Sequence, residues 1–440
     1  MPVTFNPSTR SRYILILVYL VLALLGLLFI RNLVDFPVYY AAGQSLLSGR
    51  TDLYASDFAL GRVMDYRYLP LFLILFMPLW LVPYSTSAFI WYLLCIFEIT
   101  ACVIVIRRVF PSLSGSWKMW LLIALSTSQY FVMAIHYGNV HLLAIALLFG
   151  CFYFLTNGRD TIAGLLMAFA ITLKMTPVVL LPYFAVKRRW KMLGMVVIFL
   201  AALNIAPALY FGFSQNIRLI RMWYDHVISS QEFHEDNGPI NLSLKGELRR
   251  YLSMIDYSKR VDGDVQYPEI NVGSFSRETI EPIWIVFSSI AFVLAILIVL
   301  ARGDPSQRVI EQKELTNQRF SGEIALMLCL MLFVGPLTSK IYFVALLWPV
   351  AHLASIAERN KSRNAQLATG VLLIVAVANS VLPLLPGRSV QRLLLVVGVD
   401  FYLNCLVMAA VALLLIASYR VIRSQSGEPQ MRVQSAAKAP

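Results

Sequence analysis

The sequence predicts an all-α integral membrane protein that crosses the bilayer about twelve times, with two of the spans short. Hydrophobic residues make up 59% of the 440 positions and charged residues only 14%. A soluble chain has about 45–50% apolar and about 25% charged residues, so this composition leaves too little charge for a surface in water. A bilayer suits it, because outward-facing apolar side chains cost nothing there.

Apolar runs of the required length follow one another along the chain. A helix needs about 20 apolar residues to cross about 30 Å of hydrocarbon. We expect spans over 13–30, 86–106, 117–136, 139–157, 191–213, 282–301, 321–337, 341–357, 365–384 and 393–420. Two shorter runs, 161–173 and 176–186, flank Lys174 and predict a hairpin of short helices. No cleavage pattern follows 13–30, which indicates a retained first span.

The stretch 69–83 is apolar but contains three prolines, which break a helix. If it does not cross, every basic cluster falls on one side, as the positive-inside rule requires. The clusters are Arg10/Arg12, Arg107/Arg108, Arg159, 187–191, 302–319, Arg359/Lys361/Arg363 and Arg420/Arg423. This solution places both termini inside and the loops 31–85 and 214–281 outside, where short amphipathic helices are expected. Residues 1–423 would form one polytopic domain, and 424–440 a disordered cytoplasmic tail.

Charge and cysteine usage narrow the function classes. The net charge is +13, but the basic residues lie in short clusters between apolar runs, which argues against a nucleic-acid partner. The five cysteines all lie inside apolar runs and none forms a CxxC pair, so neither a disulfide framework nor a zinc site is expected. No acidic ligand cluster for a metal is evident.

Polar side chains at the outer membrane edge are the candidates for chemistry, because charge is costly there. Asp35 follows the first span, and its apolar neighbours should raise the pKa of the carboxyl, which suits a general base. An ordinary interfacial aspartate is the alternative. Tyr39, Tyr40 and Tyr68 in the same loop are candidates for sugar or acceptor binding, although an aromatic belt would also explain them.

A second candidate set is HYGNVHLL, at an expected outward turn centred on Gly138. A turn needs only glycine and asparagine, so His136 and His141 beside Asn139 go beyond that need. These side chains could bind hydroxyls or phosphate, or they could cap helix ends, and the sequence leaves both open.

Cations on the outer side form a third set. Lys174 lies there against the usual preference of lysine, and a lipid-borne phosphate is the natural partner for a lone ammonium; snorkelling is the alternative. Lys340, in GPLTSKIYF, lies at another outward turn. In the second outer loop, NLSLKGELRR offers Asn241 and Ser243 for sugar or acceptor binding and Arg249 for phosphate, on a short amphipathic surface helix.

The run DFPVYYAAGQSLLSGRTDLY is followed by YRYLPLFLILFMPLWLVP. Together they resemble the opening of glycosyltransferase family 87, the polyprenol-phosphate-mannose-dependent α-mannosyltransferases of the GT-C superfamily. Its GQxN segment is similar to YGNVHLLAIALL, its glycine–lysine–proline segment to AGLLMAFAITLKMTPVVLLPYFAVKRRW, and its NQSLxGxxxR segment to NLSLKGELRR. The resemblance covers residues 31–350.

The resemblance implies a GT-C fold in which the first outer loop supplies the catalytic base, here Asp35. It also implies an inverting transfer that needs no metal or other cofactor, with a polyprenyl-phosphate sugar as donor and a glycolipid or glycan as acceptor. We therefore expect a hexosyltransferase, with mannose as the sugar, in a bacterial inner membrane with its active site outside. A transporter or flippase of a lipid-linked substrate is the alternative, and a noncatalytic envelope-assembly scaffold is a third possibility.

Overall fold

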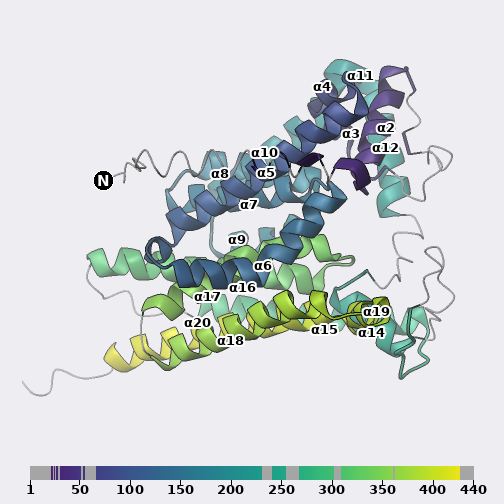
Figure 1. Cartoon of the computed structure of the whole chain (residues 1–440). Helices are drawn as coiled ribbons and strands as arrows, with labels where there is room; N and C mark the ends of the chain where they lie inside the picture. Colours follow the sequence, from purple (N-terminus) through teal and green to yellow (C-terminus); the bar gives the residue numbers. More distant parts are fainter. Residues whose placement is uncertain are drawn as a thin grey trace, which may run out of the picture.

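The protein folds into helices throughout the part of the chain that its computed structural model describes (Figure 1). That part comprises residues 30–50, 53–54, 66–229, 240–253, 267–301, 309–359 and 362–426, with a few positions between 21 and 27. The expected first span 13–30 lies almost wholly outside the described residues, as does the tail beyond residue 426. Within the described residues there is no β-strand, which confirms the all-α prediction.

Long helices alternate with short ones. The long helices are α5 (Tyr84–Val109), α6 (Trp117–Tyr137), α7 (His141–Thr156), α8 (Asp160–Leu173), α10 (Trp190–Ile205), α15 (Arg277–Leu300), α16 (Val309–Val334), α17 (Leu347–Arg359), α18 (Arg363–Val381) and α20 (Val399–Ser426). The short ones are η1 (Ile30–Asn32), α2 (Phe36–Leu47), α3 (Pro70–Leu75), α4 (Met77–Trp80), η3 (Pro111–Leu113), η4 (Thr176–Leu180), α9 (Leu181–Val186), α11 (Ala208–Phe211), α12 (Phe213–Trp223), η5 (Tyr224–Ile228), α14 (Leu244–Leu252), η7 (Lys340–Leu346), η8 (Leu382–Leu384) and α19 (Arg388–Val397).

Seven helical segments among the described residues are long and apolar enough to cross a membrane. The helices α15 and α10 expose most of their apolar side chains, as lipid-facing helices do, whereas the segment Lys340–Arg359 is 83% buried inside the protein. The chain is therefore a membrane protein with several spans. A total of about twelve spans and a GT-C arrangement stay predictions.

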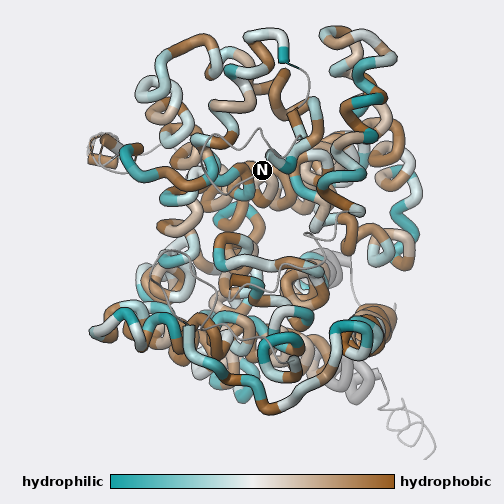
Figure 2. The backbone as a smooth tube through the Cα atoms, turned by 90° about the vertical axis from the view of Figure 1, so that its right-hand side faces the viewer, coloured by the Kyte–Doolittle hydropathy of each residue, from teal (hydrophilic) through white to brown (hydrophobic). Residues whose placement is uncertain are grey.

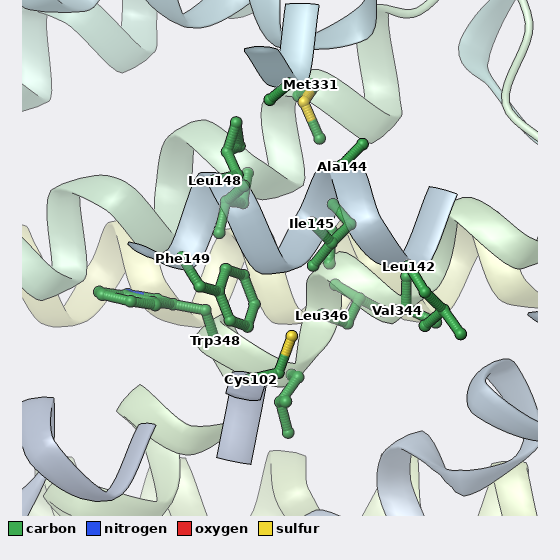
Figure 3. Packing of buried hydrophobic residues seen from close by; sticks show 14 of the residues in the cluster. Cys102, Leu142, Ala144, Ile145, Leu148, Phe149, Met331, Val344, Leu346 and Trp348 are labelled. Carbon is green, nitrogen blue, oxygen red and sulfur yellow. The ribbon is translucent and has the colours of Figure 1, made fainter. Parts of the chain in front are cut away.

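The core forms around α7, whose buried side chains meet helices from distant parts of the sequence (Figure 3). Phe149 packs edge-to-face against Trp348 of α17, with the ring centroids 5.4 Å apart. Cys102 of α5 and Met331 of α16 are also fully buried in this cluster. Buried on both sides in this way, α7 fixes the position of the turn that precedes it.

Proline or glycine divides several apolar stretches of the chain into shorter helices. Residues 69–83 form α3 and α4, which are six and four residues long and so cannot cross a bilayer as one helix. The expected span 393–420 is instead divided between α19 and α20, because Gly398 ends α19 with a φ of +78°. The span expected over 191–213 is confirmed by the apolar segment Trp190–Phe211, although Pro207 divides its helix into α10 and α11. Gly212, with a φ of +78°, then begins α12.

The connections between helices form two groups, and hydrogen bonds and ion pairs among the described residues join residues within each group. Residues 35 and 137, 67 and 223, 242 and 338, and 251 and 397 are paired by hydrogen bonds in one group. Residues 116 and 358, 160 and 189, and 187 and 323 are paired in the other. The first group lies at one end of the helices, together with α2, α3, α12, α14 and α19, on the right-hand side of Figure 1. Figure 2 shows this side from the front, with hydrophilic and hydrophobic segments interspersed.

Candidate active site

Asp35 stands immediately before α2, but its side chain does not cap that helix. Its backbone N–H donates to Tyr137 O at 2.8 Å, which attaches the start of α2 to the end of α6. The carboxylate instead accepts a hydrogen bond from the Asn139 side-chain amide. A carboxylate that is not used by its own helix is available for chemistry, and here its orientation is set by a residue 104 positions away.

The turn between α6 and α7 provides that orientation. Gly138 ends α6 with a φ of +61°, as predicted for a tight outward turn, and a Cβ there would lie 3.1 Å from Phe36 Cβ. Asn139 Oδ1 accepts from the His141 backbone N–H at 2.8 Å, so its amide NH₂ is left to hold Asp35. Trp91 Nε1 donates to Gly138 O at 2.8 Å and fixes the turn against α5.

Lys174 follows α8 and extends toward two tyrosines. Its Nζ lies 3.5 Å from the Tyr342 hydroxyl, 4.9 Å from the centre of the Tyr68 ring and 5.6 Å from that of Tyr342. In the described part of the chain, Lys174 forms no ion pair with a carboxylate. An ammonium held between aromatic rings, with no described carboxylate in direct contact, is ready to bind an anion.

Aromatic side chains join these groups into one cluster. The hydroxyls of Tyr39 and Tyr68 are 2.6 Å apart, and the His141 ring lies 4.2 Å from that of Tyr342. His141 is almost fully buried, and within the described residues neither ring nitrogen has a hydrogen-bond partner. The structure thus brings together residues predicted from three separate motifs.

Burial and nearby cations act on Asp35 in opposite directions. Removal from water raises the pKa of its carboxyl, while the Asn139 hydrogen bond and the charges of Lys174 and Arg67 partly offset that effect. The net pKa is above the ordinary value of 3.8. A carboxyl that is a stronger base than a free aspartate, next to a lone cation, suits the removal of a proton beside a departing anion.

Comparison with known families identifies the chemistry. The model of glycosyltransferase family 87 matches residues 66–311, more than half of the chain. The chain belongs to glycosyltransferase family 87. No curated protein and no solved structure matches it. Family 87 membership makes the protein a glycosyltransferase, which acts on a sugar donor and an acceptor, and favours a transferase over the transporter alternative.

The family 87 match covers only part of the candidate site. Asn139, His141 and Lys174 lie within the matched residues, whereas Asp35, Lys340 and Tyr342 lie outside them. The expected resemblance over 31–350 is therefore supported for its central part. The roles of the outlying residues depend on the contacts described above.

Two of the predicted sugar-binding residues have other contacts in the family 87 protein. Tyr40 donates its hydroxyl to Val82 O at 2.8 Å and packs edge-to-face on Tyr84, so it joins α2 to the residues before α5. His136 lies in the last turn of α6 beside the Tyr137 ring, 6.0 Å away between centroids. Their sugar-binding roles stay predictions that these contacts do not favour.

Asn241 and Ser243 fasten α14 to the rest of the transferase. Asn241 Oδ1 accepts from the backbone N–H of Ser243 at 3.2 Å and from that of Thr338 at 3.1 Å. Its amide donates to Pro336 O at 3.0 Å, and the Ser243 hydroxyl caps α14. The predicted contact of these two residues with a sugar stays a prediction, but their side chains form hydrogen bonds with backbone groups.

The charged face of α14 is turned into the protein rather than toward lipid. Lys245 and Arg249 both pair with Glu281 of α15, at 2.8 and 2.6 Å, and Arg250 pairs with Glu247. Arg249 is only 2% exposed. The predicted amphipathic helix forms, but its orientation is the reverse of that expected for a helix on the membrane surface. Glu281 of α15 and Glu247 of α14 itself offset its charge. This placement disfavours Arg249 as a ligand for the donor phosphate.

Gly246 permits this close packing of α14. A Cβ at this position would lie 2.0 Å from Asn241 O, so the peptide would have to move. We expect Gly246→Ala to lower the free energy of unfolding by about 2 kcal/mol. The matched control is Gly194→Ala in α10, where a Cβ meets nothing within 4 Å and stability should be unchanged or higher. Thermal unfolding in detergent measures both variants; an equal effect at the two positions would contradict this account.

Lys340 also has a carboxylate partner that the sequence did not predict. Its Nζ lies 3.4 Å from Asp400 Oδ2 at the start of α20. Tyr342 and Asp400 are the residues near the site to which the sequence assigned no specific role. An aromatic residue in GPLTSKIYF, close to a predicted outward turn, was the available signal for Tyr342.

Among the described residues, no group of three or more His, Cys, Asp or Glu side chains could hold a metal ion. The five cysteines are free, and four of them are buried.

Proposed function

We propose that this family 87 transferase moves a hexose, with mannose as the expected sugar, from a polyprenyl-phosphate donor to a hydroxyl of a glycolipid or glycan. The observation that supports this most is that one cluster contains both a candidate base and a candidate phosphate-binding cation. Asp35 is a carboxylate of raised pKa, and Lys174 is a cation without a carboxylate partner among the described residues. A base and an anion-binding group on either side of a reacting carbon are what the transfer requires.

The step balances with these two groups. The acceptor hydroxyl attacks the anomeric carbon while Asp35 takes its proton, and the bond from that carbon to the phosphate oxygen breaks. The polyprenyl phosphate leaves with the bonding electrons, and Lys174 stabilises the charge that develops on it. Attack from the side opposite the leaving group inverts the configuration at the anomeric carbon.

Charge distribution supports an active site outside a bacterial inner membrane. The basic clusters lie on one group of connections, which also holds the contacts of residues 116, 160, 187 and 358. The candidate site lies among the other group of connections, with Asp35 bound to Tyr137. By the positive-inside rule the site then faces away from the cytoplasm, where donors carried on polyprenyl phosphate are used.

The experiment is transfer of radiolabelled mannose from synthetic polyprenyl-phosphate-mannose to extracted envelope lipids and glycans by the purified protein in lipid nanodiscs. GDP-mannose serves as the control donor. Transfer from the lipid-linked donor alone supports the proposal, whereas transfer from GDP-mannose alone, or donor movement between leaflets without transfer, would contradict it. Other polyprenyl-phosphate hexoses tested in parallel identify the sugar.

The pH dependence of the reaction tests the Asp35 assignment. A base must be deprotonated, so kcat/KM should rise with pH through the pKa of Asp35, and burial places this rise above pH 3.8, the ordinary value. Because the Lys174 charge lowers the pKa of Asp35, Lys174→Met should move the rise to higher pH. A pH profile of kcat/KM for both proteins measures the shift. An unmoved profile would show that these two groups do not interact.

A further inference from the structure

We propose that Asp400 is an internal counter-anion for Lys340, and that Lys340 exchanges this carboxylate for an oxygen of the donor phosphate when the donor binds. This inference rests on the proposed function. Lys340 begins η7 and its side chain is 27% exposed, whereas the Asp400 side chain is 8% exposed. The cation is thus the accessible member of the pair, and the anion is the fixed one.

The pair is held more loosely than comparable pairs in the same protein. Lys340 Nζ lies 3.4 Å from Asp400 Oδ2, whereas Lys187–Glu323 and Lys245–Glu281 are both at 2.8 Å. Charge-assisted hydrogen bonds are typically about 2.7–2.9 Å long. Lys340 therefore loses less interaction energy on leaving Asp400 than Lys187 or Lys245 would lose on leaving its own carboxylate partner.

Asp400 keeps a hydrogen-bond donor when Lys340 leaves. The Tyr130 hydroxyl lies 2.9 Å from Asp400 Oδ1 and 3.2 Å from Asn379 Oδ1, so a buried polar network holds the carboxylate in place. Glu247 lies near enough that the negative charge of Asp400 contributes, after burial, to raising its pKa to about 8. A buried carboxylate without its cation is unfavourable, and this draws Lys340 back to Asp400 once the phosphate departs.

One short helix joins Lys340 to the residue that contacts the site cation Lys174. Lys340 and Tyr342 lie within one turn of the 3-10 helix η7, and the Tyr342 hydroxyl is 3.5 Å from Lys174 Nζ. A released Lys340 can therefore join Lys174 on the phosphate. Its return to Asp400 would help the polyprenyl phosphate product to leave, so Asp400 acts as a positioning residue through Lys340.

The test is binding of farnesyl phosphate to the full-length protein in phosphatidylcholine nanodiscs by calorimetry, with farnesol as the uncharged control. We expect Asp400→Asn to bind farnesyl phosphate about fivefold more tightly, the scale of a partly exposed ion pair. Lys340→Met should bind it about tenfold more weakly, and Asp400→Asn should have no further effect in that background. Tyr130→Phe, which weakens the same network without changing charge, should not tighten binding.

Three results would overturn the inference. Asp400→Asn that binds farnesyl phosphate no better than the wild type shows that the carboxylate does not compete with it. If Asp400→Asn tightens farnesyl phosphate binding equally in the Lys340→Met background, the Asp400 charge repels the phosphate directly and Lys340 is not exchanged. Wild type that binds farnesyl phosphate no better than farnesol refutes the proposed donor class itself. If Asp400→Asn is too unstable to titrate, Asp400→Glu, whose longer side chain holds Lys340 more closely, should bind farnesyl phosphate more weakly, and tighter binding contradicts the exchange.

Discussion

Asp35→Asn is expected to reduce hexose transfer by about a thousandfold while leaving the fold and donor binding intact, because loss of a general base typically costs about 10²–10⁴-fold. The substitution keeps the shape of the side chain. The Asn139 amide can still donate to its carbonyl oxygen, and the backbone bond from residue 35 to Tyr137 O does not involve the side chain. Transfer rates with polyprenyl-phosphate-mannose, farnesyl phosphate binding and thermal stability measure the three quantities separately.

Asp225→Asn is the matched control for this variant. Asp225 lies in η5 and is exposed. Its replacement should leave transfer within about twofold of the wild type, as most exposed substitutions do. Asp35→Asn with full activity would remove Asp35 as the base. A loss of thermal stability equal to the loss of activity would assign it a structural role instead.

Lys174→Met should raise the KM for the lipid-linked donor by about a hundredfold, because a charge-assisted hydrogen bond contributes about 1.5–3 kcal/mol. Methionine preserves the length and packing of the side chain between the Tyr68 and Tyr342 rings but removes the charge. Lys174→Arg keeps the charge and should restore part of the affinity, although its planar head fits this aromatic frame differently. Steady-state kinetics with varied donor concentration separate KM from kcat.

The control for Lys174 is Lys118→Met, at an exposed position in the first turn of α6. It should leave the donor KM unchanged. If Lys174→Met changes kcat alone, the lysine stabilises only the transition state and does not help to hold the donor in the ground state. Unchanged KM and kcat would mean that another cation meets the phosphate.

Much of the candidate site could be predicted because each residue type is unusual where it occurs. A carboxylate after the first span, an asparagine beside a turn glycine and a lysine on the outer side are all costly or conspicuous at a membrane edge. Gly138 and Lys174 therefore stand out in the sequence, and the structure places Asp35, Asn139 and Lys174 in one cluster. Their chemical roles stay predictions until the experiments above are done.

The partners of the other cations could not be predicted. Arg249 meets Glu281 across 32 residues, and Lys174 meets Tyr342 across 168. In NLSLKGELRR the basic residues indicate a surface helix as readily as a buried one, since nothing nearby in the sequence shows that α15 supplies an acidic partner. The sequence likewise did not distinguish Lys174 from Lys340, which has Asp400 beside it.

The sequence by itself determined that this protein is helical, that it lies in a membrane and that its polar motifs gather at the ends of helices. Composition, the length of apolar runs and the positions of proline and glycine are sufficient for those conclusions, because each depends on local chemistry and on the thickness of the bilayer. Only the tertiary structure decided that Lys174, unlike Lys340, has no ion pair among the described residues, and which residue orients Asp35. In a bilayer every outward face is apolar, so hydropathy does not specify which helix faces meet, and packing between distant helices assigns the partners.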